Sequence, residues 1–358
     1  MTTRPRDIAD RPNQGLIRSM IGSRAGSLVG VPMDALSDVL RAVRLTGAVF
    51  FDVRASDPWV AEAPPGESIV NVIFPGAEHL ISYHVVTHGD CWGGLIGEPP
   101  VRLSAGDIIV FPRGEAHVMS SAPGMRETPD LAVYRRPDEG RLPFTISMGS
   151  SRPDPARIVC GFLGCDARPF NPLLAALPRV IRVSDRAGGA LGAFVQLAVA
   201  ESKAPRIGGE CVLSRLSELM FVDVVRQYLE TLPPESSGWL AGLRDPFVGR
   251  AIAALHVRPA RDWTLEALAR DVGLSRSALA ERFTLFVGQP PMQYLTNWRM
   301  QLAANHLLTG QESVAQAAER VGYESEAAFS RAFKKVVGVP PSQWRRRRAG
   351  ETESSRRQ

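Results

Sequence analysis

Four of the six histidines lie in the first third of the chain, as His79, His84, His88 and His117. A neutral imidazole can bind a metal ion, or it can hydrogen-bond a small molecule in a pocket. His84 and His88 would point to one face of a strand that ran through both, although Gly89 indicates a turn. Two kinds of site follow: a metal site with His84, His88 and His117, or an effector pocket with His79, His84, Trp92 and His117.

Three cysteines, Cys91, Cys160 and Cys165, form a second group of reactive types in the same region. A thiol that senses oxidants must be an exposed thiolate of low pKa near a resolving thiol. The alternative is that these cysteines are buried and inert. With Cys211, the four cysteines are too few for a disulfide scaffold. The sequence therefore predicts either redox sensing or simple packing.

Short segments punctuated by Gly and Pro surround these residues. Short strands at such spacing indicate a β-sandwich or barrel. The predicted strands are Ala48 to Val53, Ser68 to Ile73, Leu80 to Thr87, Val101 to Leu103, Asp107 to Phe111, Ala132 to Tyr134 and Arg157 to Phe162.

The stretch from Gly106 to His117 fits the pattern G-x5-P-x-G-x2-H. It resembles the second motif of cupins, and the resemblance covers about Met33 to Pro178. That resemblance implies a cupin-like β-barrel with His117 pointing inward. Metal-binding cupins have H-x-H followed by Glu in their first motif, whereas this chain has three residues between His84 and His88 and lacks that Glu. We therefore expect an effector-sensing domain without metal, cofactor or catalytic residues.

The last third of the chain contains one pattern twice. Leu265, Leu268, Ala269, Val272 and Gly273 recur about fifty residues later as Val314, Ala317, Ala318, Val321 and Gly322. The spacing i, i+3, i+4, i+7 predicts a short helix with one apolar stripe that ends at the glycine. Thr264 and Ser313 precede these helices as N-caps, and Ser275 and Ser325 cap a second helix in each copy. Each copy is thus a predicted helix-turn-helix.

On the second helix of each copy, the apolar positions are kept and the opposite face differs. At 100° per residue, five positions fall on that outward arc. They are Arg276, Ser277, Ala280, Glu281 and Thr284 in the first copy, and Glu326, Ala327, Ser330, Arg331 and Lys334 in the second. Two scaffolds that pack alike but touch different parts of a partner would show this pattern. For a helix-turn-helix, that partner is the major groove of double-stranded DNA.

The double unit resembles the AraC/XylS family of transcription regulators. The residues that carry the resemblance are Trp263 to Leu268, Trp298-Arg299-Met300, Leu302 to Leu308, and Gly338 to Arg345, within about Pro246 to Arg347. The resemblance implies that Ser277, Ala280 and Glu281, and Glu326, Ala327, Ser330 and Arg331, face bases. Arg276 could reach a base or a phosphate, and the run Arg345 to Arg348 suits phosphates.

The charged residues also distinguish the region with the repeat from the rest of the chain. From Leu243 onward there are 18 lysines and arginines against 11 aspartates and glutamates, whereas the preceding part has 24 against 26. A basic region that contains the repeat is typical of nucleic-acid binding. No window is long and apolar enough for a membrane span, and Asp7, Asp10 and Arg11 interrupt any signal peptide. We therefore expect a cytoplasmic protein.

Two helices are predicted between the halves, over Gly189 to Ser202 and Glu210 to Leu232. The second has a wide apolar face, which favours a homodimer, although packing on the barrel would explain it as well. Pro233 to Gly238 reads as a linker.

These observations predict a multidomain α and β protein. The expected parts are a disordered extension (1–32), a cupin-like sensing domain (33–178), a helical linker and dimerisation region (179–243), a DNA-binding domain (244–348) and a disordered tail (349–358). The extension would be absent if translation began at Met33. We expect a transcription regulator controlled by an unidentified effector or a redox signal in the cupin domain. An activator that contacts RNA polymerase is the expected role, although the sequence leaves activation or repression open. The alternative is a metal-dependent cupin enzyme fused to a DNA-binding module.

Overall fold

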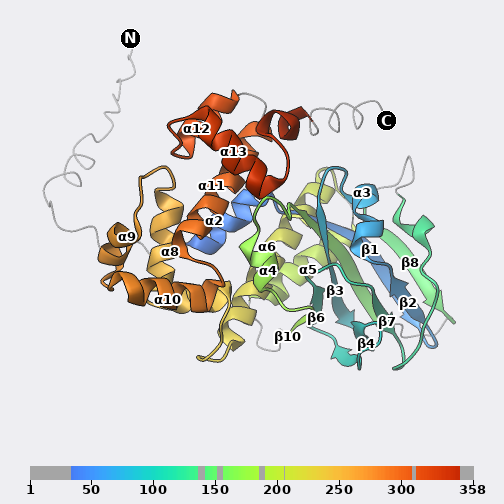
Figure 1. Ribbon diagram of the computed structural model, residues 1–358. Helices are drawn as coiled ribbons and strands as arrows, with labels where there is room; N and C mark the ends of the chain where they lie inside the picture. Colours follow the sequence, from blue (N-terminus) through green and yellow to red (C-terminus); the bar gives the residue numbers. More distant parts are fainter. Residues whose placement is uncertain are drawn as a thin grey trace, which may run out of the picture. The chain divides into compact units, whose positions relative to one another are not determined.

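The computed structural model describes residues 34–135, 142–150, 156–184, 190–204, 206–308 and 312–346 (Figure 1). The expected disordered extension over 1–32 and tail over 349–358 lie outside these residues, as do Arg347 and Arg348. Within the described ranges, no helix is long and apolar enough to cross a membrane.

The N-terminal half is built on two β-sheets. Sheet A has six strands in the order β10-β6-β3-β9-β1-β8, and its β1–β8 pair is parallel. Sheet B has four strands in the order β2-β7-β4-β5. The strands of sheet A are β1 (Thr46–Ser56), β3 (His79–His88), β6 (Asp107–Phe111), β8 (Phe144–Gly149), β9 (Ala156–Cys165) and β10 (Ile181–Ser184); those of sheet B are β2 (Val60–Ala63), β4 (Asp90–Leu95), β5 (Val101–Ser104) and β7 (His117–Ser120).

Side chains alternate between the two faces of sheet A, as strand geometry requires. On its inner face, Phe51, Ile109 and Phe162 join residues of sheet B, such as Met119, in one apolar cluster. The predicted cupin domain is therefore present as two packed sheets. In the described residues, no backbone pairing links the two sheets into a closed barrel.

Two predicted strands are helical instead. The segment Ser68 to Ile73 forms the end of a 3-10 helix, Gly66–Ser68, and a single α-turn, α3 (Val70–Ile73). In this segment Ile69 and Val70 are buried and the next two residues are exposed. Such a pattern fits a helix, whereas a strand would alternate buried and exposed residues. Leu131–Tyr134 is a 3-10 helix in which the Asp130 side chain accepts from Ala132 N.

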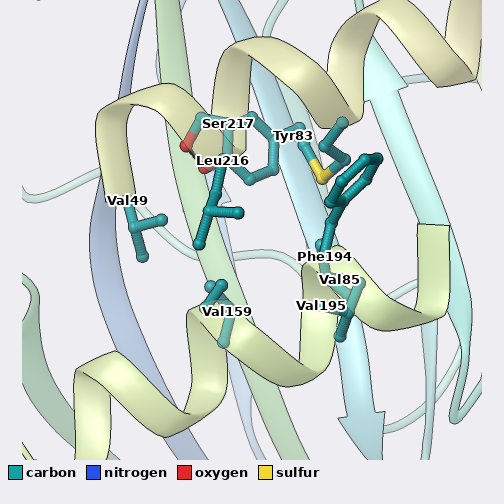
Figure 2. Close-up of a pocket in the computed structure, with 10 residues that line it drawn as sticks. Val49, Tyr83, Val85, Val159, Phe194, Val195, Leu216 and Ser217 are labelled. Carbon is teal, nitrogen blue, oxygen red and sulfur yellow. Dashed lines mark hydrogen bonds between the residues drawn. The ribbon is translucent and has the colours of Figure 1, made fainter. Parts of the chain in front are cut away.

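Two long helices cover the outer face of sheet A. They are α5 (Ala190–Lys203) and α6 (Gly209–Thr231), within one residue of the predicted bounds. Figure 2 shows Val49, Tyr83, Val85 and Val159 of the sheet packed beneath these helices. Gly47 permits the close approach of α6, because a Cβ there would lie 2.6 Å from the Cβ of Ser217.

The C-terminal half is helical. Its helices are α7 (Trp239–Arg244), α8 (Val248–Val257), α9 (Leu265–Val272), α10 (Arg276–Val287), α11 (Pro291–Leu308), α12 (Val314–Arg320) and α13 (Glu326–Val337), followed by helical residues 341–346. The pairs α9–α10 and α12–α13 are the two predicted helix-turn-helix units, and α11 joins them.

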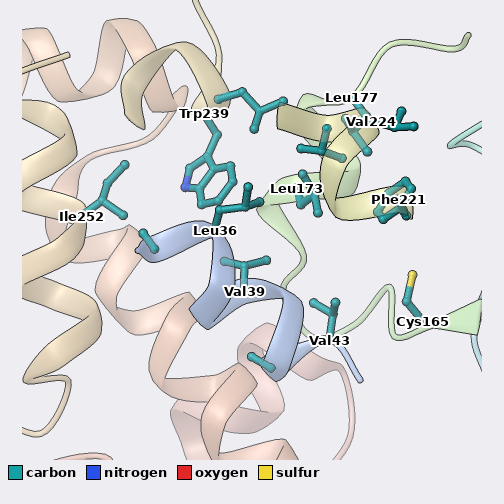
Figure 3. Packing of buried hydrophobic residues seen from close by; sticks show 14 of the residues in the cluster. Leu36, Val39, Val43, Cys165, Leu173, Leu177, Phe221, Val224, Trp239 and Ile252 are labelled. Carbon is teal, nitrogen blue, oxygen red and sulfur yellow. The ribbon is translucent and has the colours of Figure 1, made fainter. Parts of the chain in front are cut away.

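The apolar residues that pack the helical half belong to two clusters. One cluster includes Phe283 and Tyr294 and continues through α2 (Ala35–Ala42) and α4 (Pro172–Ala176) to the outer face of sheet A. Figure 3 shows Leu36 and Val39 of α2 in this cluster, near Trp239 and Leu173. The other cluster consists of residues from α11, α12 and α13 with Val321 and Trp344, and Leu302 of α11 packs against both clusters.

Candidate nucleic-acid interface and effector cavity

Local caps fix the ends of both helix-turn-helix units. The side chains of Thr264 and Ser275 accept from the backbone N–H groups three residues ahead. Ser313 and Gln316 form a reciprocal capping box, and Ser325 caps α13. These four caps and the turn glycines were predicted, and the structure confirms them.

The turn glycines Gly273 and Gly322 both have left-handed backbones, with φ of 81° and 82°. At Gly322 space is limiting as well, because a Cβ would lie 2.4 Å from the carbonyl oxygen of Ala260. The turn of the second unit therefore needs glycine for two separate reasons.

The outward face of α10 carries few free cations. Arg276, Ser277, Glu281 and Thr284 are exposed and Ala280 is half-buried. Arg276 forms an ion pair with Glu266 of α9, 2.7 Å apart. Both partners are more than half exposed, so this pair contributes little to stability and can open.

Arg282 of α10 turns toward the domain through an ion pair. Its guanidinium donates to both carboxylate oxygens of Asp245, at 2.5–3.1 Å. Asp245 also accepts from the backbone N–H groups of Phe247 and Val248, at the start of α8. Arg282 thus fastens α10 to α8, and its charge is compensated within the unit.

The outward face of α13 is equipped differently. Glu326, Ala327, Arg331 and Lys334 are exposed, and Ser330 is half-buried. In the part of the chain that the structure describes, the cations of Arg331 and Lys334 form no ion pair or hydrogen bond. Arg345, just past this unit, donates to the carbonyl of Glu312 at 3.3 Å. The second unit therefore presents long cationic side chains that are available to a partner.

A cavity of about 280 Å³ lies between the two sheets and is called the effector cavity here. Its lining is mostly apolar, with aromatic and sulfur-bearing side chains, and this is typical of a small-molecule site. The residues that line it include Phe51, Val53, Trp59, Glu62, His84, His117, Met119, Asp130, Tyr134, Ile146, Met148, Cys160 and Phe162.

His84 and His117 meet in this cavity, with their Nε2 atoms 2.8 Å apart. Burial lowers the pKa of His117 to about 4 and that of His84 well below 6.5, and His117 lowers the latter further. Both rings are therefore neutral at pH 7. His117 Nδ1 faces the carbonyl of Glu115 at 2.9 Å, so this nitrogen must carry the proton and donate.

The tautomers of His84 and His117 follow from the hydrogen bond between His117 Nδ1 and the carbonyl of Glu115. His117 Nε2 has no proton and accepts, so His84 donates from Nε2 and keeps a bare Nδ1. His84 Nδ1 is buried and has no partner in the described residues. Trp59 Nε1, also on the lining, is a buried donor without a partner there. The cavity thus contains one unused acceptor and one unused donor.

The other predicted pocket residues lie elsewhere. His79 Nε2 is 2.7 Å from the carbonyl oxygen of Pro112, and burial lowers its pKa. Neither His79 nor Trp92 of β4 lines the effector cavity. His88 lines a separate cavity on the outer face of sheet A, away from His84 and His117. In the described residues, no group of three or more His, Cys, Asp or Glu is arranged to hold a metal.

The three cysteines proposed as redox candidates are buried and unpaired by disulfides. Burial raises the pKa of Cys91 to about 12 and also raises the pKa values of Cys160 and Cys165. Such thiols stay protonated at neutral pH and are poor nucleophiles. Only Cys160 of these three lines the effector cavity.

Several lining residues were not predicted from the sequence, among them Trp59, Tyr134 and Met148. They come from segments far apart in the chain, and no motif marks them. A strand with alternating apolar residues at Phe144, Ile146 and Met148 was the available signal, and it was missed.

The two packed sheets, joined to two helix-turn-helix units with exposed helices, define the class of protein: a DNA-binding transcription regulator with a cupin domain. A family model described as Cupin matches residues 34–230, and one described as Helix-turn-helix domain matches residues 268–347. The chain belongs to the AraC-like family of transcription regulators.

Three relatives match most of the chain. Two proteins described as AraC-like transcription regulators, from Streptomyces lividans and Streptomyces antibioticus, are each 32% identical, cover 88% of this chain, and are themselves covered over 98% and 99%. The HTH-type transcriptional regulator AlkR of Acinetobacter baylyi is 27% identical over 87% of this chain and 99% of its own length.

Proposed function

We propose that the chain controls transcription by inserting α10 and α13 into successive major grooves of specific double-stranded DNA, and that a small molecule in the effector cavity regulates this binding. The observation that carries the DNA part is the pair of alike-packed helices whose outward faces are exposed and differ at all five corresponding positions. Two helices that pack alike but carry different outward side chains are what we expect if each helix contacts a different stretch of DNA.

The two helices contribute unequally in this proposal. Arg331 reads a base, since an exposed guanidinium can bond guanine through two atoms. Glu326, Ala327 and Ser330 face the same groove, and Lys334 reaches a phosphate. In α10, Ser277, Ala280, Glu281 and Thr284 make short contacts, and Arg276 reaches the DNA after leaving Glu266. Arg345 adds a phosphate contact that carries no sequence information.

The effector is expected to be a neutral, mainly apolar molecule with one hydroxyl group. The lining buries apolar atoms, and the neutral histidine pair provides no cation for an anionic head group. A hydroxyl can donate to His84 Nδ1 and accept from Trp59 Nε1, and these are the two buried atoms of the cavity lining that have no partner in the described residues. The raised thiol pKa values favour such an effector over a redox signal.

A cytoplasmic homodimer is also part of the proposal. Most of the apolar face of α6 packs on sheet A, including Leu213, Leu216 and Met220, but Val212 and Leu219 remain exposed. With exposed Leu197 of α5, they offer a narrow apolar strip to a second copy. Activation through contact with RNA polymerase completes the proposed role, and no catalytic step is assigned to the cupin domain.

Selection of DNA from a random pool by the purified full-length protein tests the DNA part. We expect enrichment of a motif with two segments about 10 base pairs apart, one for each helix. Recovery of unenriched sequences would contradict specific recognition.

A matched pair of probes tests the effector part separately: 4-tert-butylphenol and tert-butylbenzene differ by one hydroxyl. The phenol should raise the thermal unfolding temperature of the protein more than the hydrocarbon does. His84→Phe should remove that difference. Equal shifts with both probes would contradict the assigned hydrogen bonds and leave the DNA-binding role untouched.

A further inference from the structure

Three basic residues lie side by side across neighbouring strands of sheet A, and together they are called the row here. In the strand register, Arg157 of β9 lies opposite Arg54 of β1 on one side and opposite His88 of β3 on the other. Like charges directly opposite each other on neighbouring strands destabilise a sheet. Neither the Arg54 nor the Arg157 guanidinium has an ion pair or hydrogen bond in the described residues. The repulsion between these two arginines is therefore not offset by an ion pair within the described residues.

A β-bulge shapes β3 at the same row. The register with β9 shifts between Val86 and His88, which leaves Thr87 as the extra residue. Thr87 Oγ1 donates to the carbonyl of Arg157 at 3.1 Å and so fixes the bulge. As a result Thr87 and His88, although adjacent in the chain, both line one cavity. Bulges re-aim side chains in this way beside functional sites.

The cavity has a volume of about 210 Å³ and is called the cationic cavity here. It is lined by Asp52, Arg54, Thr87, His88, Arg157, Val159 and Val199. Val159 also belongs to the apolar layer beneath α5 and α6 in Figure 2. The cationic cavity therefore lies at the edge of that layer, where the side chains on the outer face of sheet A are charged instead of apolar.

We infer that the cationic cavity binds a small molecule that carries an oxyanion, as a carboxylate or a phosphate, together with a hydrogen-bond donor. Two guanidinium groups on neighbouring strands can each hold an oxyanion through paired N–H donors. The Asp52 carboxylate, two residues from Arg54 on β1, accepts from a hydroxyl or ammonium group of the same molecule. Such a ligand neutralises the row and bridges sheet A to Val199 of α5.

This site is independent of the proposed function. It lies on the outer face of sheet A, and the effector cavity lies on the inner face. The effector cavity suits a neutral apolar molecule, whereas the cationic cavity suits a charged polar one.

Thermal unfolding of the full-length protein tests the inference. Chloride is replaced by phosphate or by lactate at constant ionic strength. We expect the unfolding temperature to rise with either anion and to saturate, because a ligand that binds only the folded state stabilises it. Arg157→Gln and Arg54→Gln should each weaken the apparent affinity about tenfold, since a hydrogen bond to a charged group is lost. The anion that saturates at the lower concentration identifies the carboxylate or phosphate class.

Arg168→Gln is the matched control, because it removes one exposed positive charge beside Glu78, at the end of β3 opposite to His88, and should keep the full anion response. In chloride alone, Arg54→Gln should unfold at a temperature no lower than the wild type, since its removal relieves repulsion. The inference is overturned if neither anion raises the unfolding temperature. It is equally overturned if Arg157→Gln responds to both anions as the wild type does, since the effect would then come from the solvent.

Discussion

The two helix-turn-helix units have the same caps and turns, yet they differ in what supports them. The first unit packs in one apolar cluster with α2 and the outer face of sheet A. The second packs in a cluster of its own around Phe329, Phe333 and Trp344. Their surfaces differ as well, because Arg276 and Arg282 of the first are held in ion pairs while Arg331 and Lys334 of the second are not. Duplicated units have thus diverged both inside and outside.

The difference indicates a division of roles. A unit that shares its core with the cupin domain can respond to that domain, because a change in one part of a packed core is felt by the rest. A unit with a separate core can keep a fixed reading surface while the first one shifts. Allosteric control needs two such states with different affinity for the effector.

Two side chains of α11, the helix that joins the two units, bond to the N-terminal half. Gln301 of α11 is 1% exposed, donates to the carbonyl of Ala42 at 3.0 Å and accepts from Phe170 N at 2.9 Å. Asn305 donates to the same carbonyl at 2.7 Å. These bonds, together with the shared cluster, connect α2 and the segment before α4 to the helix that links the two units.

The largest expected effect is on stability, and it should differ between substitutions in the two apolar clusters. Phe283→Ala and Phe333→Ala each remove a fully buried ring, and each should cost about 3–5 kcal/mol of unfolding free energy. Phe283→Ala should also lower the transition of the cupin domain, whereas Phe333→Ala should spare it. Urea unfolding followed by Trp fluorescence and by proteolysis of the cupin domain measures both. Identical effects of the two variants on the cupin domain would refute separate cores.

Acid should destabilise the cupin domain through its two buried histidines. The folded-state pKa of His117 is about 4, below the ordinary 6.5, and the pKa of His84 is lowered in the same direction. As the pH falls below 6.5, the unfolded chain therefore takes up protons before the folded one does, and stability is lost down to about pH 4. A shift like that of His117 corresponds to about 3 kcal/mol. Urea unfolding at pH 7 and pH 4.5 should show a smaller loss in His117→Gln than in the wild type.

Specific DNA affinity should depend more on the second unit. Arg331→Ala should cost about 1–3 kcal/mol on the selected DNA and relax the preference at one base pair. Ser277→Ala, at an exposed position of α10, should cost less. Fluorescence anisotropy on selected and random DNA gives both values. If Arg331→Ala weakens binding equally on both DNAs, Arg331 contacts a phosphate and reads no base.

The smallest effect should come from releasing Arg276. Glu266→Gln removes its exposed partner, so the cation becomes available to DNA at a cost of less than about 1 kcal/mol in stability. Binding to DNA should tighten slightly and become more salt-dependent. Glu319→Gln, which removes an acidic group from α12, is the charge-matched control. A salt dependence that changes equally in both variants would reflect net charge alone.

Local signals made much of this structure predictable. The caps at Thr264, Ser275, Ser313 and Ser325 depend on residues three positions apart, so the sequence contains all the information that they need. The same holds for the helix bounds of α5 and α6. The strands β2, β4, β7 and β10 were not predicted, because they have only four to six residues and a segment of that length shows no decisive periodicity.

Long-range relations were the part that could not be predicted. His84 and His117 were both candidates, but only the pairing of strands shows that their rings touch while His88 lies across the sheet. The bond between Gln301 and Ala42 joins residues 259 positions apart, and no local pattern encodes it. Trp59 and Tyr134 line the cavity, but the segments that contain them carry no motif.

The shared core of the first unit also bears on how such regulators exchange parts during evolution. A recombination joint in the linker Pro233 to Gly238 would separate Trp239 and Leu240 from their apolar partners on α2 and α4. Each hybrid would then inherit an unmatched interface, and its two halves would need to mutate together before it folded well. Exchange of the second unit alone, at a joint near the end of α11, would leave that interface intact. New operator preferences are thus expected to spread through exchange of the segment from the end of α11 to the end of the DNA-binding region, while the sensor keeps its own first unit.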